Sequence, residues 1–303
     1  MLILTIWPLF ALICLGFLLA RRGWPDPGFW PAAEKLNYFL LFPALLVSSL
    51  ANAPLSDPAI LQMGGAALVT IALAALAMWG IRRTFLPATP ARFGPAFQGV
   101  VRFNTYIGLA VTAGLTGTTG LGQAAVYLAV AVPFVNVLSI MALSKSTGLR
   151  AAPAMARSIL ANPLILACIV GILLAMLGTG LPYGLDRFLD LMGRASLPLG
   201  LLCVGAALRP GALRQDLTQL VSISAVRLIA MPLFAALIAR VMGLQGTEAL
   251  VLVTFSAIPV APTAYVLTRQ LGGDATLMAG LVTAQTLAAV ATIPLMLRLL
   301  GMG

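Results

Sequence analysis

The stretch NTYIG, residues Asn104 to Gly108, places two polar side chains inside the apolar run 94–115. A run of this length has about the 20 residues that a helix needs to cross roughly 30 Å of hydrocarbon. In such a helix Asn104 must either hydrogen-bond to a neighbouring helix or line a cavity. The stretch therefore predicts a membrane helix that is interrupted near its middle.

Apolar runs of similar length recur along the whole chain. Of its 303 residues, 61% are hydrophobic and 9% are charged, so the polar residues are too few to cover a water-soluble surface. The runs are continuous rather than alternating, which excludes membrane strands. We therefore expect an all-α integral membrane protein with ten transmembrane helices, near residues 2–20, 36–53, 58–81, 94–115, 121–143, 158–177, 187–208, 216–239, 249–268 and 275–300.

The basic residues gather on one side of the expected membrane. Because most of them lie in or beside alternate connections, the net charge of +10 indicates topology rather than a nucleic-acid-binding patch. These connections should face the cytoplasm, with both termini on the periplasmic side of an inner membrane. The first span should be retained, since Arg21-Arg22 follow it and no cleavage site is present. The residues are Arg21, Arg22, Lys35, Arg82, Arg83, Arg92, Lys145, Arg150, Arg157, Arg209, Arg214 and Arg269.

The two halves of the chain match each other. A shift of 155 residues superimposes the stretch 104–108 in the fourth span on 259–263 in the ninth, and it also pairs prolines and glycines elsewhere: Pro8 with Pro163, Gly16 with Gly171 and Pro43 with Pro198. This indicates a duplicated unit of five helices, 1–150 and 151–303. An odd number of spans inserts the second copy upside down, which is the inverted-repeat plan of many secondary transporters.

Several motifs resemble those of the auxin efflux carrier family, which includes the plant PIN auxin exporters and bacterial permeases such as malonate carriers. The resemblance covers essentially the whole chain. It is most specific in the Asn-Thr-x-x-Gly motif of the fourth span and the prolines of the ninth. The matching segments are Pro8 to Gly23, Leu41 to Leu46, Phe103 to Gly108, Asn162-Pro163, Leu197-Pro198, Arg227 to Leu233 and Pro259 to Gly273.

The resemblance implies a fold of two inverted five-helix repeats, in which broken helices 4 and 9 cross at the membrane centre. Helices 1, 2, 6 and 7 would form a scaffold, and helices 3–5 and 8–10 a moving transport domain. One departure is that Gly108 is followed by Leu109 rather than by the nearby proline of many relatives. This weakens any inference of substrate from the plant exporters more than it weakens the fold.

The motif of the fourth span, with Asn104, Thr105 and Gly108, forms one half of the candidate substrate site. Its asparagine amide and the free backbone N–H groups of the following half-helix would bind a carboxylate. The alternative is that Asn104 only holds two helices together. Pro259 and Pro262 form the other half, because they free backbone carbonyls in the ninth span; the alternative for them is a simple kink.

Three further polar residues lie inside spans. Arg227 lies about eleven residues into the eighth span, near the bilayer midplane, where it needs a partner or water. It either attracts an anionic substrate, or the span boundary is misplaced and its side chain reaches an interface. Asn136 and Gln285 are weaker candidates that either line the substrate path or bridge helices.

The remaining motifs carry no chemistry. Cys14, Cys168 and Cys203 lie in separate spans without metal-ligand spacing, so we expect them to pack as small apolar groups, with no metal and no cofactor. The glycines of 117–122 are in the wrong order for a dinucleotide fingerprint and indicate a turn. No phosphate-binding loop, histidine or buried carboxylate pair is present, so we expect neither an enzyme nor a primary pump.

The sequence therefore favours a secondary transporter, an exporter or facilitator of small organic anions that works by alternating access. Its partners would be a small carboxylate and the lipid bilayer, with no nucleic acid; a homodimer is left open. A sodium-coupled symporter of the bile-acid carrier type and a non-transporting receptor are the alternatives. Because all eight acidic residues fall in connections or near span ends, we expect transport that is driven by the membrane potential and needs no sodium.

Overall fold

The computed structural model describes residues 2–51, 58–82, 90–143, 162–178, 181 and 184–302, and these residues contain helices but no strand. The helices are α1 (Leu2–Arg21), α2 (Phe29–Leu36), α3 (Phe42–Ala51), α4 (Pro58–Ile81), α5 (Pro90–Val101), α6 (Thr105–Leu143), α8 (Pro163–Leu177), α9 (Leu185–Ala206), α10 (Leu217–Ala225), α11 (Met231–Val241), α12 (Gly246–Ala257), α13 (Thr263–Gln270) and α14 (Ala275–Leu299). Two π-helical turns, η1 (Asn37–Leu41) and η4 (Val226–Ala230), join α2 to α3 and α10 to α11, and a 3-10 turn, η3 (Pro210–Arg214), precedes α10.

The prediction of an all-helical membrane protein is confirmed. Within the described ranges, six helical stretches are long and apolar enough to cross a membrane. Large apolar side chains such as Leu4 on α1, Met176 on α8 and Val241 on α11 are exposed. A soluble protein rarely exposes so many, whereas lipid solvates them without cost.

The longest helical stretch contains a bend. α6 has 39 residues, which at about 1.5 Å each would extend well beyond one bilayer core. Gly117 has a φ of 66°, in the left-handed region that glycine adopts without a side-chain clash. The helix bends there, so the turn predicted over 117–122 is reduced to this one position.

Close helix contacts join the two halves of the sequence. α1 packs against α9, and α3 packs against both α8 and α9. A Cβ atom on Gly16 of α1 would overlap the backbone of Leu202 on α9, and one on Gly171 of α8 would lie 2.6 Å from the Cβ of Leu50 on α3. Glycine at these two positions allows the helix backbones to touch, as in other membrane helix pairs.

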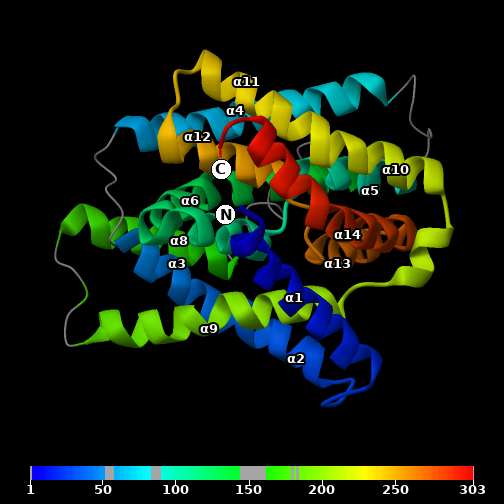
Figure 1. Ribbon diagram of the computed structural model, residues 1–303, viewed down its shortest axis with the longest axis horizontal. Coiled ribbons are helices and arrows are strands. Elements are labelled where there is room, and N and C mark those ends of the chain that lie inside the picture. Colours follow the sequence, from blue (N-terminus) through cyan, green and yellow to red (C-terminus); the bar gives the residue numbers. More distant parts are fainter. Residues whose placement is uncertain are drawn as a thin grey trace.

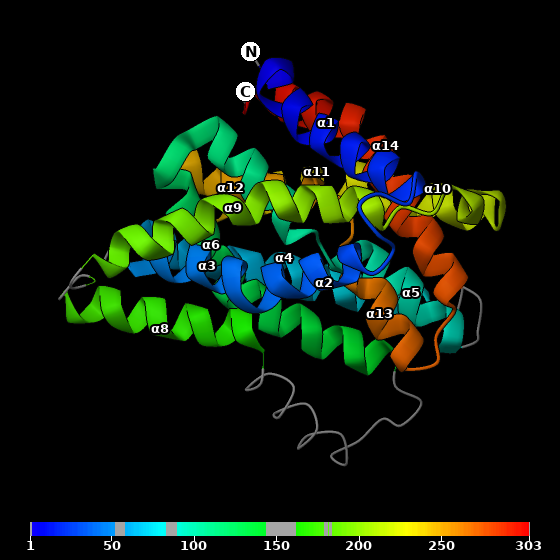
Figure 2. The same ribbon diagram turned by 90° about the horizontal axis from the view of Figure 1, so that it is seen from below.

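Figure 1 shows α4 and α11 along one edge of the molecule and α9 and α2 along the opposite edge, with α6 and α12 between them. α12 packs against α6 and α11, and α4 packs against α6. In Figures 1 and 2 the start of α1 and the end of α14 lie close together.

Two interruptions lie at the centre, as the sequence predicts. Residues 102–104 separate α5 from α6, and residues 258–262 separate α12 from α13. The backbone N–H of Asn104 donates a hydrogen bond of 2.8 Å to the carbonyl of Pro259. The two broken stretches therefore touch each other.

The second predicted span begins too late. It was expected over 36–53, but its helix begins at Phe29 and continues through α2, η1 and α3 to Ala51. Glu34 and Lys35 lower the mean hydropathy of the first two turns. The apolar residues of these turns lie on one face of the helix and do not form a continuous apolar run. As a result Glu34, which the sequence places at a span end, lies within this helix and is half-buried.

Candidate substrate-binding site

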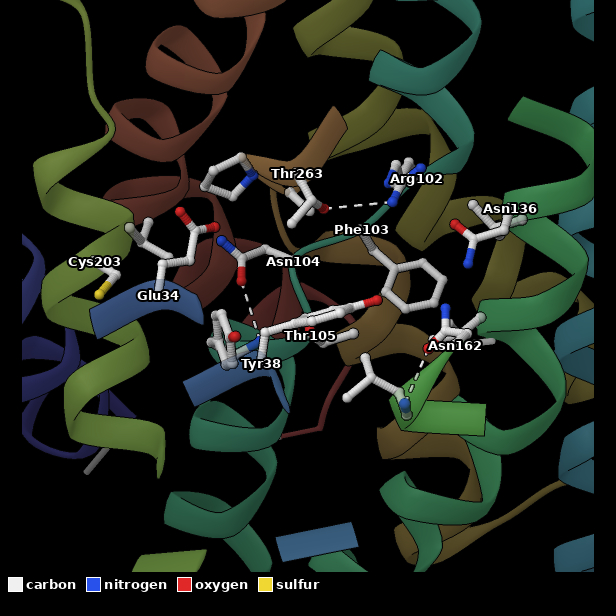
Figure 3. A pocket seen from close by; sticks show the side chains of 17 residues that line it. Glu34, Tyr38, Arg102, Phe103, Asn104, Thr105, Asn136, Asn162, Cys203 and Thr263 are labelled. Carbon is white, nitrogen blue, oxygen red and sulfur yellow. Dashed lines mark hydrogen bonds between the residues drawn. The ribbon is translucent and has the colours of Figure 1, made fainter. Parts of the chain in front are cut away.

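A cavity of about 70 Å³ lies where the two interruptions meet. Its apolar wall includes Val132, Val135 and Leu164. Its polar lining comes from five parts of the chain (Figure 3): Glu34 and Tyr38 before α3, Arg102, Asn104 and Thr105 at the first break, Asn136 on α6, Asn162 before α8, and Thr263 at the second break.

Asn104 caps the half-helix that follows it. Its side-chain oxygen accepts hydrogen bonds from the backbone N–H groups of Tyr106, at 3.1 Å, and Ile107, at 3.3 Å. The free end of a helix is satisfied in this way by an N-cap residue. These two N–H groups are therefore occupied, contrary to the expectation that they bind a carboxylate. The buried side-chain Nδ2 of Asn104 is a donor that has no hydrogen-bond partner among the described residues.

Arg102 precedes Asn104 by two residues and was not recognised in the sequence. One of its guanidinium nitrogens, Nη2, lies 3.4 Å from the Oγ1 of Thr263 across the second break. The other, Nη1, is buried and has no hydrogen-bond partner among the described residues. A guanidinium has five N–H donors in a planar fork that suits a carboxylate, so this side chain can anchor one.

Glu34 also lines the cavity, which corrects the expectation that no carboxylate lies within the spans. In Figure 3 its carboxylate lies on the Cys203 side of Asn104, whereas Arg102 lies beyond Thr263. The argument for transport driven by the membrane potential alone assumed that no carboxylate lies within the spans. Glu34 removes this premise. A charged residue within a span was the available signal for Arg102, just as it was for Arg227.

A larger cavity of about 600 Å³ adjoins the first. The two share Glu34, Cys203 and Pro262 in their linings. The larger cavity is also lined by Arg209, whose guanidinium stacks on the ring of Tyr265 at 4.4 Å. Of these two charged residues, Glu34 is half-buried and also lines the smaller cavity, whereas Arg209 is exposed.

Arg227 does not line either cavity described above. It is fully buried on η4 and donates hydrogen bonds to three backbone carbonyls: those of Val100 at 2.9 Å, Phe255 at 2.6 Å and Ile258 at 2.8 Å. These carbonyls lie at the carboxyl ends of α5 and α12, where the helix dipoles are negative. The guanidinium thus joins both broken helices and offsets the negative ends of their dipoles. It does not reach a membrane interface, so the alternative of a misplaced span boundary is wrong.

Gln285 on α14 completes this junction. Its Nε2 donates to the carbonyl of Gly99 at 2.9 Å, and its Oε1 accepts from the N–H of Val260 at 2.9 Å. Both amide groups are therefore used by the backbone of the two interruptions. The helix-bridging alternative describes the position of Gln285 in this conformation.

The predicted site residues separate into two groups. Asn104, Thr105, Asn136 and Pro262 line the smaller cavity. The others, Arg227, Gln285, Pro259 and Gly108, form its framework. The carbonyl of Pro259 accepts a hydrogen bond from the N–H of Asn104. A Cβ on Gly108 would lie 2.6 Å from the ring of Phe255.

Apolar spanning helices and a buried polar cavity at the contact of two broken helices define a membrane transport protein. The family model described as "Membrane transport protein" matches residues 144–297, just over half of the chain. A protein of Methanothermobacter thermautotrophicus named "Uncharacterized transporter" is 26% identical over 299 residues, which cover 96% of each chain. The chain belongs to this family, the auxin efflux carrier family of permeases, and is a transport protein rather than an enzyme.

Proposed function

We propose that this protein is a secondary carrier, an exporter or facilitator, of small carboxylates, which bind in the 70 Å³ cavity. The observation that carries the proposal is that two buried donors of the cavity lining, the Nδ2 of Asn104 and the Nη1 of Arg102, have no hydrogen-bond partner among the described residues. Buried donors are almost always satisfied in proteins. A carboxylate would satisfy either donor, and it carries the charge opposite to that of Arg102.

We further propose that the chain crosses the membrane ten times as two inverted repeats. Support comes from the two broken stretches, which lie at matching positions of the 155-residue shift and touch each other. A second support is the exchange of partners: α1 of the first half packs against α9 of the second, and α8 of the second packs against α3 of the first. Helices 1, 2, 6 and 7 would then be the scaffold against which the rest moves.

The proposed orientation places both termini outside the cytoplasm of the inner membrane. It predicts that alkaline phosphatase fused after residue 303 is active and that green fluorescent protein at the same position is dark, because each reporter works on only one side. The proximity of the ends of α1 and α14 supports a common side for the termini. The same reporters inserted in the connection before α10 serve as the control and should give the reverse result. A fluorescent C-terminal fusion would refute the orientation or the count of ten.

The purified protein in liposomes should catalyse carboxylate flux that does not change when sodium is replaced by choline. The reason is that unwound carbonyls can bind sodium in carriers, but here the carbonyls of Val100, Phe255 and Ile258 are already bound by Arg227. Uptake of labelled substrate, with the potential clamped by potassium and valinomycin, is the measurement. A strict sodium requirement would support the symporter instead, and binding without flux would support a receptor.

A further inference from the structure

We propose that Glu34 is the proton-binding residue of this carrier, so that a carboxylate binds in the smaller cavity together with one proton on the side chain of Glu34. This inference rests on the carboxylate carrier proposed above and adds its coupling ion. It is carried by a half-buried carboxylate without a partner that lines both the smaller and the larger cavity. The proton comes from water, and a monocarboxylate and this proton together add no net charge to the protein.

The protein itself leaves the carboxylate of Glu34 unpaired. Glu34 has no side-chain hydrogen bond or ion pair to any part of the chain that the structure describes. A carboxylate that loses part of its hydration without gaining a partner is unfavourable in its charged form. A proton removes the charge and with it this cost.

The substrate site and Glu34 share one cavity. Figure 3 shows the amide nitrogen of Asn104, one of the two donors without a partner, turned toward Glu34. A carboxylate in this cavity of about 70 Å³ brings a second negative charge near Glu34. Like charges within about 4–6 Å oppose each other's ionisation, so direct contact is not required. A proton on Glu34 replaces the repulsion and gives the side chain an O–H donor.

Three arginines line the two cavities and would favour an ionised Glu34: Arg102, Arg209 and Arg269. Arg102 is the cation that the substrate carboxylate neutralises, so binding withdraws its influence on Glu34. Arg209 and Arg269 are exposed, and the charges of exposed groups are screened by water and salt. Substrate binding therefore shifts Glu34 toward its protonated form.

The other titratable groups of the two linings do not accept a proton near neutral pH. Tyrosine and cysteine side chains ordinarily lose their proton only at about pH 10 and about pH 8.5, so they are protonated before the substrate arrives. The chain contains no histidine. Glu34 is therefore the group of the described lining that can take up the proton. The groups that are already protonated are Tyr38, Tyr106, Tyr265 and Cys203.

The larger cavity gives a proton access to Glu34. Its volume is about 600 Å³, and its lining includes the exposed side chains of Arg209 and Arg269. A polar cavity of this size holds water. Because Glu34 belongs to the lining of both cavities, it can exchange a proton with this water while the substrate occupies the smaller cavity.

The test is the pH dependence of carboxylate binding to the purified protein. Acetate, propionate and lactate are the probes, because a simple carboxylic acid titrates near pH 4 and stays ionised from about pH 6 to about pH 8. Ligand binding raises the unfolding temperature by mass action, so thermal-shift titrations at each pH give the affinities. Uptake of one proton strengthens binding about tenfold for each unit that the pH falls.

We expect a probe to bind about ten- to a hundredfold more tightly at about pH 6 than at about pH 8. Equal affinity at the two pH values would overturn the inference while leaving the carboxylate carrier in place. If none of these acids binds at either pH, the proposed function itself fails.

Glu34→Gln replaces the carboxylate by a neutral side chain of nearly the same shape, as protonation does. Its affinity for the probe should be the same at both pH values and close to that of the wild type at the lower one. Asp190→Asn is the matched control, because Asp190 is an exposed carboxylate that pairs with Arg194 and lines neither cavity. This control should keep the pH dependence of the wild type.

A pH dependence that persists in Glu34→Gln would assign the proton to another group and refute the role of Glu34. Calorimetry of the wild-type protein in two buffers with different ionisation enthalpies counts the protons that accompany binding. We expect one proton taken up for each carboxylate bound. No uptake, or release of a proton, would overturn the inference even if the variant does not fold.

Discussion

Replacing Arg227 by methionine should prevent the protein from folding to a stable, monodisperse form. Methionine keeps an unbranched apolar stem but is shorter than arginine and cannot donate, so the carbonyls of Val100, Phe255 and Ile258 lose their partners in the centre of the molecule. A buried polar group left without a hydrogen bond costs about 1–3 kcal/mol. Three of them amount to a large part of the roughly 5–15 kcal/mol that stabilises a typical protein.

The measurement is the yield of monodisperse protein after detergent extraction, together with its unfolding temperature. Arg240→Met is the control, because Arg240 is an exposed arginine on the adjoining helix α11, and it should change stability by less than about 1 kcal/mol. Arg227→Lys should recover little, since one ammonium group cannot reproduce a planar fork that reaches three acceptors. A stable Arg227→Met protein would show that the junction of the broken helices does not depend on this side chain.

The sequence predicted the interruptions because their signals are local. Asn104 and the prolines at 259 and 262 each disfavour an uninterrupted apolar helix within a few residues. The internal shift of 155 residues paired the two breaks, and the resemblance to the auxin efflux carrier family implied that they cross. The contact between Asn104 and Pro259 agrees with both lines of reasoning.

The charges of the site were harder to predict, because their meaning depends on contacts between distant segments. Glu34 precedes the most apolar part of its span, and hydropathy alone begins that span only at residue 36. Only the packing of α2 against α9 brings its carboxylate to the cavity. Arg227 was expected to need a partner or water. Its partners are backbone carbonyls, and these become available only when two helices end beside it.

Asn104→Ala should abolish transport while the protein remains folded. The substitution removes the N-cap of α6, which costs about 0.5–2 kcal/mol, and it also removes the Nδ2 donor of the cavity. The first loss is small for a protein of this size, and the second removes a group that the substrate carboxylate needs. Flux into liposomes and the unfolding temperature, measured on the same preparation, separate the two effects.

Asn104→Asp distinguishes capping from binding more sharply. Aspartate caps a helix as well as asparagine does, so the fold of this variant should be at least as stable as that of Asn104→Ala. Its second oxygen replaces the Nδ2 donor and adds a negative charge where the substrate carboxylate binds, so flux should be lost. Normal flux in the aspartate variant would show that Asn104 serves only to begin α6, and the carboxylate would then have to bind through Arg102 and Thr263 instead.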